Sequence, residues 1–185
     1  MGASSMRLEQ TQLPGVLLLH PTVLTDQRGF FMESYNERTM ADLGIDARFV
    51  QDNHSYSVSD VLRGLHYQFE RPQGKLIRAL CGEILDVVVD LRRNSPSFGK
   101  WVSENLSGEN HIMLWLPVGV AHGFRVLSKN AHVLYKATEF YDPSSERTII
   151  WNDSDLNIDW QLKSAPIVSE KDARGINFCK APKFN

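Results

Sequence analysis

A histidine that lies close in sequence to an arginine and a lysine is the feature of this chain best suited to chemistry. Arg63, His66 and Lys75 all fall within one short segment, RGLHYQFERPQGK. Histidine accepts a proton near neutral pH, and fixed cations can hold the negative charge that proton removal leaves behind. A single histidine in a strand is more often a packed side chain than a base, so the prediction depends on the neighbouring cations. The segment predicts a site that removes a proton and stabilises the resulting anion.

The predicted strand positions of these residues decide whether they can meet. Strand periodicity allows His66 to point into the interior of a barrel. A hairpin that turns at residues 70–71 would set Lys75 opposite His66 on the neighbouring strand. Arg63 has the opposite parity, so it joins them only through a β-bulge, which Gly64 would permit.

A second motif, PVGVAHGF at residues 117–124, places His122 at the start of another predicted strand. Its PxGxxH spacing is similar to the second half of the cupin signature, in which the histidine is usually a metal ligand. The first half of that signature normally contains His-x-His, but here the pair is His66 and Gln68. Two histidines and an amide make a poor transition-metal site. We therefore expect no metal ion.

Without a metal, the enolate of a ketone must be stabilised by cations and hydrogen bonds, for which Lys75, Arg63 and His122 are suited. Inverting a carbon also needs an acid on the opposite face of the substrate ring, and a tyrosine is neutral at pH 7 and able to donate a proton. Tyr135 and Tyr141 have the same parity on a predicted strand, so periodicity does not choose between them. Either residue alone is more simply explained as a core residue.

Short stretches of alternating apolar and polar residues predict an all-β fold, and their number favours a closed barrel or jelly roll. In residues 84–91 the odd-numbered positions are predicted to face a core and the even-numbered positions, including Asp86 and Asp90, a polar side. One short helix is predicted between an N-cap at Asn36 and Gly44. The predicted strands are 16–24, 29–35, 49–56, 61–69, 75–81, 84–91, 101–106, 112–116, 121–127 and 133–141.

Length and composition indicate one globular domain over residues 1–185, with the tail at 161–185 packed on the barrel as loops and short helical turns. Residues 1–5 fit an expression scar before Met6. The chain has a net charge of −2 with scattered basic residues and no long apolar run, so we expect neither nucleic-acid nor membrane binding. The two cysteines form no CxxC pair, which indicates reduced thiols and a cytoplasmic protein.

Many motifs in order show that the chain resembles the dTDP-4-dehydrorhamnose 3,5-epimerases, a family of metal-free cupin enzymes. The resemblance implies a cupin-like jelly roll of antiparallel strands, a homodimer, and a dTDP-keto sugar as substrate. The motifs are DQRGFF at residues 26–31, FVQDNHS at 49–55, LRGLHYQ at 62–68, QGK at 73–75, SPSFG at 95–99, the PxGxxH segment at 117–124, YK at 135–136, and IDW at 158–160 through SEKD at 169–172.

The resemblance also implies roles for single residues. His66 would be the base, Tyr135 the acid, and Lys75 the cation that holds the enolate oxygen, while Asp172 would orient His66. Phe30, Phe31 and Trp115 are interpreted as core residues. Substrate contacts are implied for Arg28, Glu33, Gln51, Asp52, Asn53, Arg63, Lys75, His122, Tyr141, Glu146 and Lys171.

The implied reaction is epimerisation of dTDP-4-dehydro-6-deoxy-D-glucose at C3 and C5 through enolates, which makes the protein a cofactor-independent isomerase. Two alternatives share its chemistry: an epimerase that inverts one carbon, and a 3,4-ketoisomerase. A third alternative, from a different class, is a cupin that binds a sugar nucleotide without catalysis. A metal-dependent cupin is disfavoured by Gln68.

Overall fold

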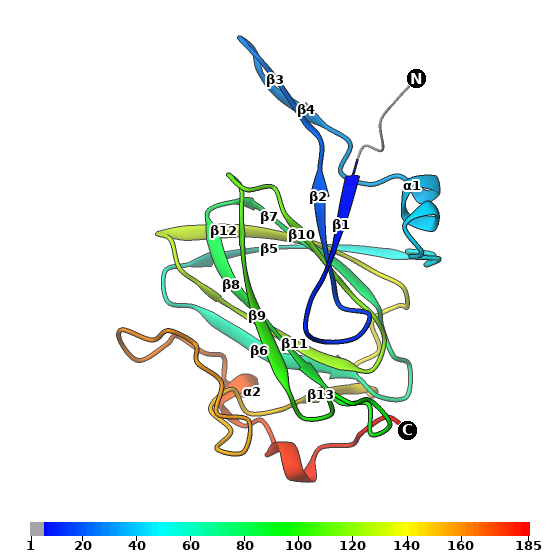
Figure 1. Ribbon diagram of the computed structural model, residues 1–185. Coiled ribbons are helices and arrows are strands. Elements are labelled where there is room, and N and C mark those ends of the chain that lie inside the picture. Colours follow the sequence, from blue (N-terminus) through cyan, green and yellow to red (C-terminus); the bar gives the residue numbers. More distant parts are fainter. Residues whose placement is uncertain (1–5) are drawn as a thin grey trace.

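The computed structural model describes residues 6–185 as two antiparallel β-sheets packed face to face (Figure 1). This arrangement confirms the prediction of an all-β jelly roll with a few short helices; the prediction for residues 1–5 lies outside the described residues. The strands are β1 (Met6–Gln10), β2 (Leu17–Pro21), β3 (Val23–Asp26), β4 (Gly29–Met32), β5 (Gln51–Val58), β6 (Leu62–Gln68), β7 (Lys75–Cys81), β8 (Glu83–Asp90), β9 (Trp101–Ser107), β10 (Met113–Leu116), β11 (Val120–Val126), β12 (Asn130–Ala137) and β13 (Glu146–Thr148), and the helices are α1 (Glu37–Asp42), α2 (Glu170–Ala173) and the 3-10 turn η1 (Phe178–Lys180).

The two sheets form the opposite walls of the barrel. One contains six strands in the order β1-β2-β10-β7-β12-β5, and the other contains five in the order β13-β6-β11-β8-β9. A separate two-stranded hairpin, β3-β4, projects away from both sheets (Figure 1). Consecutive strands β6 and β7 belong to different sheets, so inward-pointing residues of β6 face those of β7 across the interior.

Both faces of the five-stranded sheet are buried, which the alternation in β8 did not predict. Ile84 and Val88 pack between the two sheets, while Leu85 and Val87 pack on the outer face against residues of the C-terminal segment such as Trp160. Burial of each such aliphatic side chain stabilises the folded state by about 1.5–3 kcal/mol. The prediction of a polar face on β8 is wrong, because the face that carries Asp86 and Asp90 lies between the two sheets and is fully buried.

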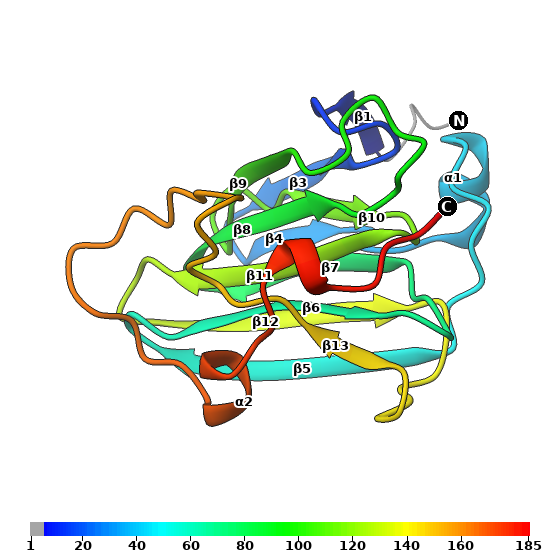
Figure 2. The same ribbon diagram turned by 90° about the horizontal axis from the view of Figure 1, so that it is seen from below.

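The C-terminal segment lies along the outer face of the five-stranded sheet. In Figure 2 it passes, coloured orange to red, in front of β11. Isolated bridges hold it in place, with Ile167 beside Val61 and Ile176 beside Ile149. Leu156 contributes to the same buried cluster. The tail therefore completes the core on this side and brings α2 next to β6.

The predicted helix is confirmed as α1. Asn36 caps it, since its side-chain oxygen accepts from the backbone N–H groups of Arg38 and Thr39. Met40 is buried against the outer face of the six-stranded sheet. Gly44 follows the helix with φ of 82°, a left-handed conformation that favours glycine.

Several predicted boundaries were wrong. The stretch 16–24 is divided into β2 and β3, and the strand predicted to reach residue 141 ends at Ala137. Two short edge strands, β1 and β13, were not predicted at all, because five and three residues give too little alternation to recognise. Phe30 and Phe31 are not core residues: they lie on the β3-β4 hairpin and are 58% and 71% exposed.

The sequence predicts neither membrane-spanning helices nor disulfides. Among residues 6–185, no helix is long and apolar enough to cross a membrane. Cys81 and Cys179 are both free and exposed, as predicted for reduced thiols.

Candidate active site

A polar cavity of about 370 Å³ lies between the two sheets and contains most of the residues to which the sequence assigned a function. Its walls are built by β5, β7 and β12 of one sheet and by β6, β11 and β13 of the other, with α2 at its rim. The lining residues are Gln51, Asn53, Ser55, Arg63, His66, Gln73, Lys75, His122, Phe124, Tyr135, Tyr141, Glu146 and Lys171.

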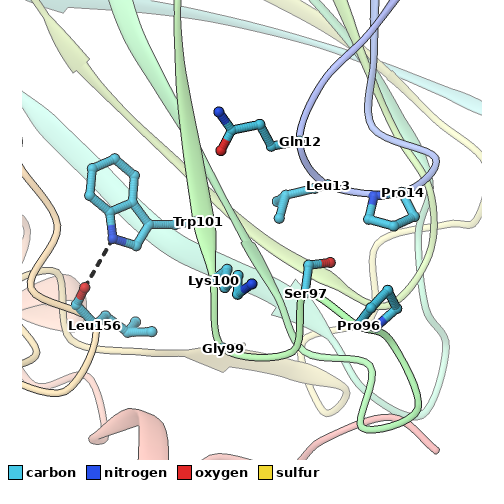
Figure 3. Close-up of a pocket in the computed structure, with 9 residues that line it drawn as sticks. All are labelled: Gln12, Leu13, Pro14, Pro96, Ser97, Gly99, Lys100, Trp101 and Leu156. Carbon is cyan, nitrogen blue, oxygen red and sulfur yellow. Dashed lines mark hydrogen bonds between the residues drawn. The ribbon is translucent and has the colours of Figure 1, made fainter.

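A larger hollow of about 550 Å³ beside β9 has a different character (Figure 3). Its lining includes Lys100 and Trp101, and the indole N–H of Trp101 donates to the backbone carbonyl of Leu156 at 3.0 Å. None of its lining side chains is a carboxylate, a histidine or a tyrosine. Acid–base chemistry is therefore assigned to the cavity between the sheets.

His66 and Asp172 form a hydrogen-bonded pair at the wall of this cavity. Nε2 of His66 lies 2.5 Å from Oδ1 of Asp172, whose side chain is 4% exposed. Because a carboxylate only accepts, Nε2 carries the proton and Nδ1 keeps its lone pair. Burial alone would raise the pKa of Asp172, but its hydrogen bond with His66 and the charge of that ring lower it overall. The pair thus holds the imidazole as an oriented base.

The short helix α2 positions Asp172 behind His66. Ser169 is the N-cap, and its hydroxyl oxygen accepts from the backbone N–H of Asp172 at 3.1 Å. Periodicity could not place this residue, since it lies in the tail, 106 positions from His66. The Ser-x-x-Asp pattern at 169–172 was the available local signal, because it is typical of the first turn of a helix.

Tyr135 and Lys75 face His66 from the opposite sheet. Tyr135 lies in β12 and Lys75 begins β7, and Nζ of Lys75 is 5.6 Å from the centre of the Tyr135 ring. Burial is the main cause that raises the pKa of Tyr135, so its phenol is neutral at pH 7. A base and a neutral acid therefore stand on opposite walls, with an ammonium group beside the acid.

The hairpin predicted between His66 and Lys75 does not exist. β6 pairs with β11 and β13, whereas β7 pairs with β10 and β12. The segment after β6 crosses from one sheet to the other, held by Gln68, whose side-chain N–H groups donate to the carbonyls of Arg71 and Phe140. The two residues share the cavity because the walls of the barrel face each other, not because their strands pair.

The bulge proposed at Gly64 is present and admits Arg63 to the cavity. His122 pairs with His66, but Phe124 pairs with Arg63, so two residues of β6 oppose one of β11. Gly64 has φ of 128°, and a Cβ there would lie 2.5 Å from the Cα of Gly123. Arg63 donates from Nε to the hydroxyl oxygen of Ser57 at 3.0 Å, on the way to the cavity rim.

Glu146 bonds two of the predicted binding residues at the rim, and a third joins them through Tyr141. Its Oε1 accepts from Nζ of Lys171 at 2.8 Å, and its Oε2 accepts from the hydroxyl of Tyr141 at 3.0 Å. The backbone N–H of Tyr141 donates in turn to the side chain of Gln51. Tyr141 follows β12 and is half exposed, and its hydroxyl proton is already donated to Glu146 at the rim. Tyr135 lies deeper in the cavity.

Three residues expected in this cavity lie elsewhere. Arg28 is on the β3-β4 hairpin, where it forms an ion pair with Asp26. Glu33 lies at the base of that hairpin and accepts from the side chain of Asn36 at 2.9 Å. Asp52 forms an ion pair with Lys136 on the outer face of the sheet, because successive strand residues alternate and its neighbours in β5 point inward.

Sequence reasoning missed one ionisable group beside the site, Asp86 in β8. It is fully buried, and its Oδ2 accepts from Nε2 of His122 at 2.8 Å. The available signal was a single carboxylate within the apolar run ILDVVV, since a continuous apolar run is typical of a strand buried on both faces. Among residues 6–185, no group of three or more His, Cys, Asp or Glu side chains is arranged to hold a metal ion.

Comparison with known proteins assigns this architecture to a family. The sequence model described as dTDP-4-dehydrorhamnose 3,5-epimerase matches residues 10–180. The dTDP-4-dehydrorhamnose 3,5-epimerase of Pseudomonas aeruginosa is 54% identical over 180 residues, which is 97% of this chain and 99% of that protein. The chain belongs to the dTDP-4-dehydrorhamnose 3,5-epimerase family.

Solved structures of dTDP-sugar epimerases agree with the fold. The enzyme of Legionella pneumophila, solved in complex with dTDP-4-keto-L-rhamnose, superposes with a TM-score of 0.92 at 47% identity, covering 96% of this chain and 95% of that one. A 3'-monoepimerase of Streptomyces bikiniensis, solved with dTDP-quinovose, has a TM-score of 0.85 at 29% identity, covering 91% of this chain and 86% of that one. The epimerase fold therefore accommodates inversion at one carbon as well as at two.

Proposed function

We propose that this protein epimerises dTDP-4-dehydro-6-deoxy-D-glucose at C3 and C5 to give dTDP-4-dehydro-L-rhamnose. The observation that supports this most strongly is the His66–Asp172 pair on one wall, opposed by Tyr135 on the other. A base and an acid on opposite sides of a bound ring are what inversion of a carbon requires. The high identity to named 3,5-epimerases over nearly the whole chain supports the choice of substrate.

Each inversion would consist of two proton transfers. Nδ1 of His66 removes the proton from the carbon next to the C4 ketone, and the electron pair moves to the ketone oxygen to form an enolate. The ammonium of Lys75 stabilises that oxygen. Tyr135 then donates its phenolic proton to the opposite face of the same carbon, and solvent restores both residues. No electrons are exchanged and every proton is accounted for, so the reaction needs no redox cofactor.

The number of carbons inverted is the point that a single experiment decides. With the dTDP-keto sugar in D₂O, we expect NMR to detect deuterium at both C3 and C5 of the product. Deuterium at C3 alone would indicate a monoepimerase, and recovery of the ketone at C3 would indicate a 3,4-ketoisomerase. Binding of the nucleotide without any exchange would indicate a binding protein.

We also propose a homodimer in which the β3-β4 hairpin of one copy completes the site of the other. The hairpin exposes Leu24, Phe30 and Phe31, an apolar surface typical of an interface. It also carries Arg28, a cation suited to a diphosphate, and the residues lining the hollow around Arg28 include none that line the cavity of the same chain. The partner proposed for this surface is a second copy of the chain.

The cytoplasm is the compartment we propose for the protein, because free, exposed thiols are typical of reducing compartments.

Mixed dimers test the exchange of hairpins between sites. Arg28→Ala should raise KM at least about tenfold, the loss of one charge-assisted contact. In a mixed dimer of Arg28→Ala with His66→Ala, one site carries both defects and the other neither, so normal KM should return with about half the turnover. If Arg28 serves its own chain instead, the mixed dimer keeps the raised KM. Light scattering that reports a monomer would contradict the homodimer directly.

A further inference from the structure

Asp86 is a buried carboxylate that the proton transfers described above do not use. It lies in the middle of β8 with no solvent exposure. Its Oδ2 accepts from Nε2 of His122, whereas its Oδ1 is buried and has no hydrogen-bond partner among the described residues. A carboxylate with an unpaired oxygen in the interior is costly, and an aliphatic residue would fit better between Ile84 and Val88. Packing alone therefore does not explain Asp86.

The side chain of Asp86 points to the interior between the two sheets, into which Lys75 also points. Its neighbours of the same parity in β8 belong to the cluster that fills this interior, as does Ile77 of β7. Lys75 has the same parity as Ile77 and lines the cavity. The carboxylate and the ammonium thus belong to facing walls of one interior and act on each other through their charges. Among residues 6–185, Nζ of Lys75 has no carboxylate within hydrogen-bond distance.

The surroundings of Lys75 shift its pKa in opposite directions. Burial lowers the pKa of Lys75 to about 8, while the carboxylates of Asp86 and Glu146 raise it against that effect and Lys171 lowers it. Burial raises the pKa of Asp86, whereas the charge and hydrogen bond of His122, and then the charge of Lys75, work in the opposite direction. The other ionisable groups that line the cavity are Arg63 and His66 of β6, Tyr135 of β12 and Tyr141 after it, and Glu104 of β9 is the cross-strand partner of Asp86.

We propose that Asp86 is a positioning residue that keeps Lys75 protonated and directs its ammonium toward the oxygen on which the enolate charge develops. This inference rests on the proposed epimerase function. Asp86 reaches the substrate only through other side chains, since it does not line the cavity itself. Its hydrogen bond with His122 fixes the tautomer of that ring, because a carboxylate requires the proton on Nε2.

The pH dependence of Asp86→Asn tests this role. Lys75 acts while it is protonated, so kcat/KM of the wild-type enzyme should fall as the pH rises through about 8. Removal of a nearby negative charge lowers the pKa of an ammonium, and we expect the alkaline limb of Asp86→Asn to move down by about one pH unit or more. An alkaline limb that stays in place would overturn the proposal.

Asp90→Asn is the matched control. Asp90 is also fully buried and has the same parity in β8, but its carboxylate is paired with Arg92, Ser95 and Ser97. Its replacement should lower the melting temperature without moving the limb. In Lys75→Arg the cation remains charged throughout the tested range, so adding Asp86→Asn to that variant should no longer change the profile.

Direct titration keeps the inference testable apart from activity. In substrate-free protein with ¹⁵N-labelled lysine, NMR should show Lys75 losing its proton at lower pH in Asp86→Asn than in wild type. If that variant does not fold, Lys75→Met should raise the pKa of the Asp86 carboxyl, followed by ¹³C NMR. Absence of coupling in either titration overturns the pairing. A coupled pair in a protein that fails to epimerise the dTDP-keto sugar would instead refute the proposed function.

Discussion

Replacement of His66 by alanine is expected to lower turnover by about 10²- to 10⁴-fold, the usual contribution of one positioned general base. The imidazole has its Nε2 fixed by Asp172 and presents Nδ1 to the cavity, so the substitution removes the group that is placed to accept the substrate proton. Binding of dTDP should persist, since the nucleotide would contact other residues. Steady-state kinetics and calorimetry with dTDP measure the two effects separately.

His54 provides the control for this substitution. It lies on the exposed outer face of β5, where it contacts His132 and does not line the cavity. His54→Ala should retain turnover within about twofold, because surface substitutions rarely disturb a distant site. Wild-type-like turnover in His66→Ala would remove this residue as the base.

Tyr135→Phe is expected to reduce product formation by at least about 10²-fold while leaving the fold intact. The substitution removes only the hydroxyl of a side chain that faces His66 from the other sheet. His66 can still remove a proton and return one to the same face, so the variant should exchange substrate protons with solvent without inverting the carbon. Product formation and exchange are measured separately by NMR.

Tyr141→Phe is the matched comparison, because Tyr141 lines the same cavity. Its hydroxyl already donates to Glu146 at the rim, so its loss should weaken substrate binding more than it slows inversion. If Tyr141→Phe loses inversion and Tyr135→Phe does not, the role of acid passes to Tyr141.

The sequence predicted the fold class and the chemical character of the site because both depend on local patterns. Alternation identified most strands, and the irregularity at Gly64 followed from the parity of Arg63. Asp172 was different: its contact with His66 joins residues 106 positions apart in the sequence, and only resemblance to a family could supply it.

The errors have a common physical origin in tertiary packing. A single sequence does not reveal that the second sheet packs over the face of β8 that carries Asp86, so Asp86 was expected on a polar face although it is fully buried. Nor does it reveal that β6 and β7 belong to different sheets, or that the hairpin bearing Arg28 projects away from its own cavity. Each of these facts depends on contacts between segments far apart in the sequence.

The central claim is that His66 and Tyr135 act on opposite faces of one carbon. The most direct test is proton exchange at C3 and C5 in D₂O, followed by NMR with His66→Ala and Tyr135→Phe side by side. We predict exchange without inversion by Tyr135→Phe, and neither exchange nor inversion by His66→Ala. Exchange by His66→Ala at the wild-type rate, or full inversion by Tyr135→Phe, would contradict the account.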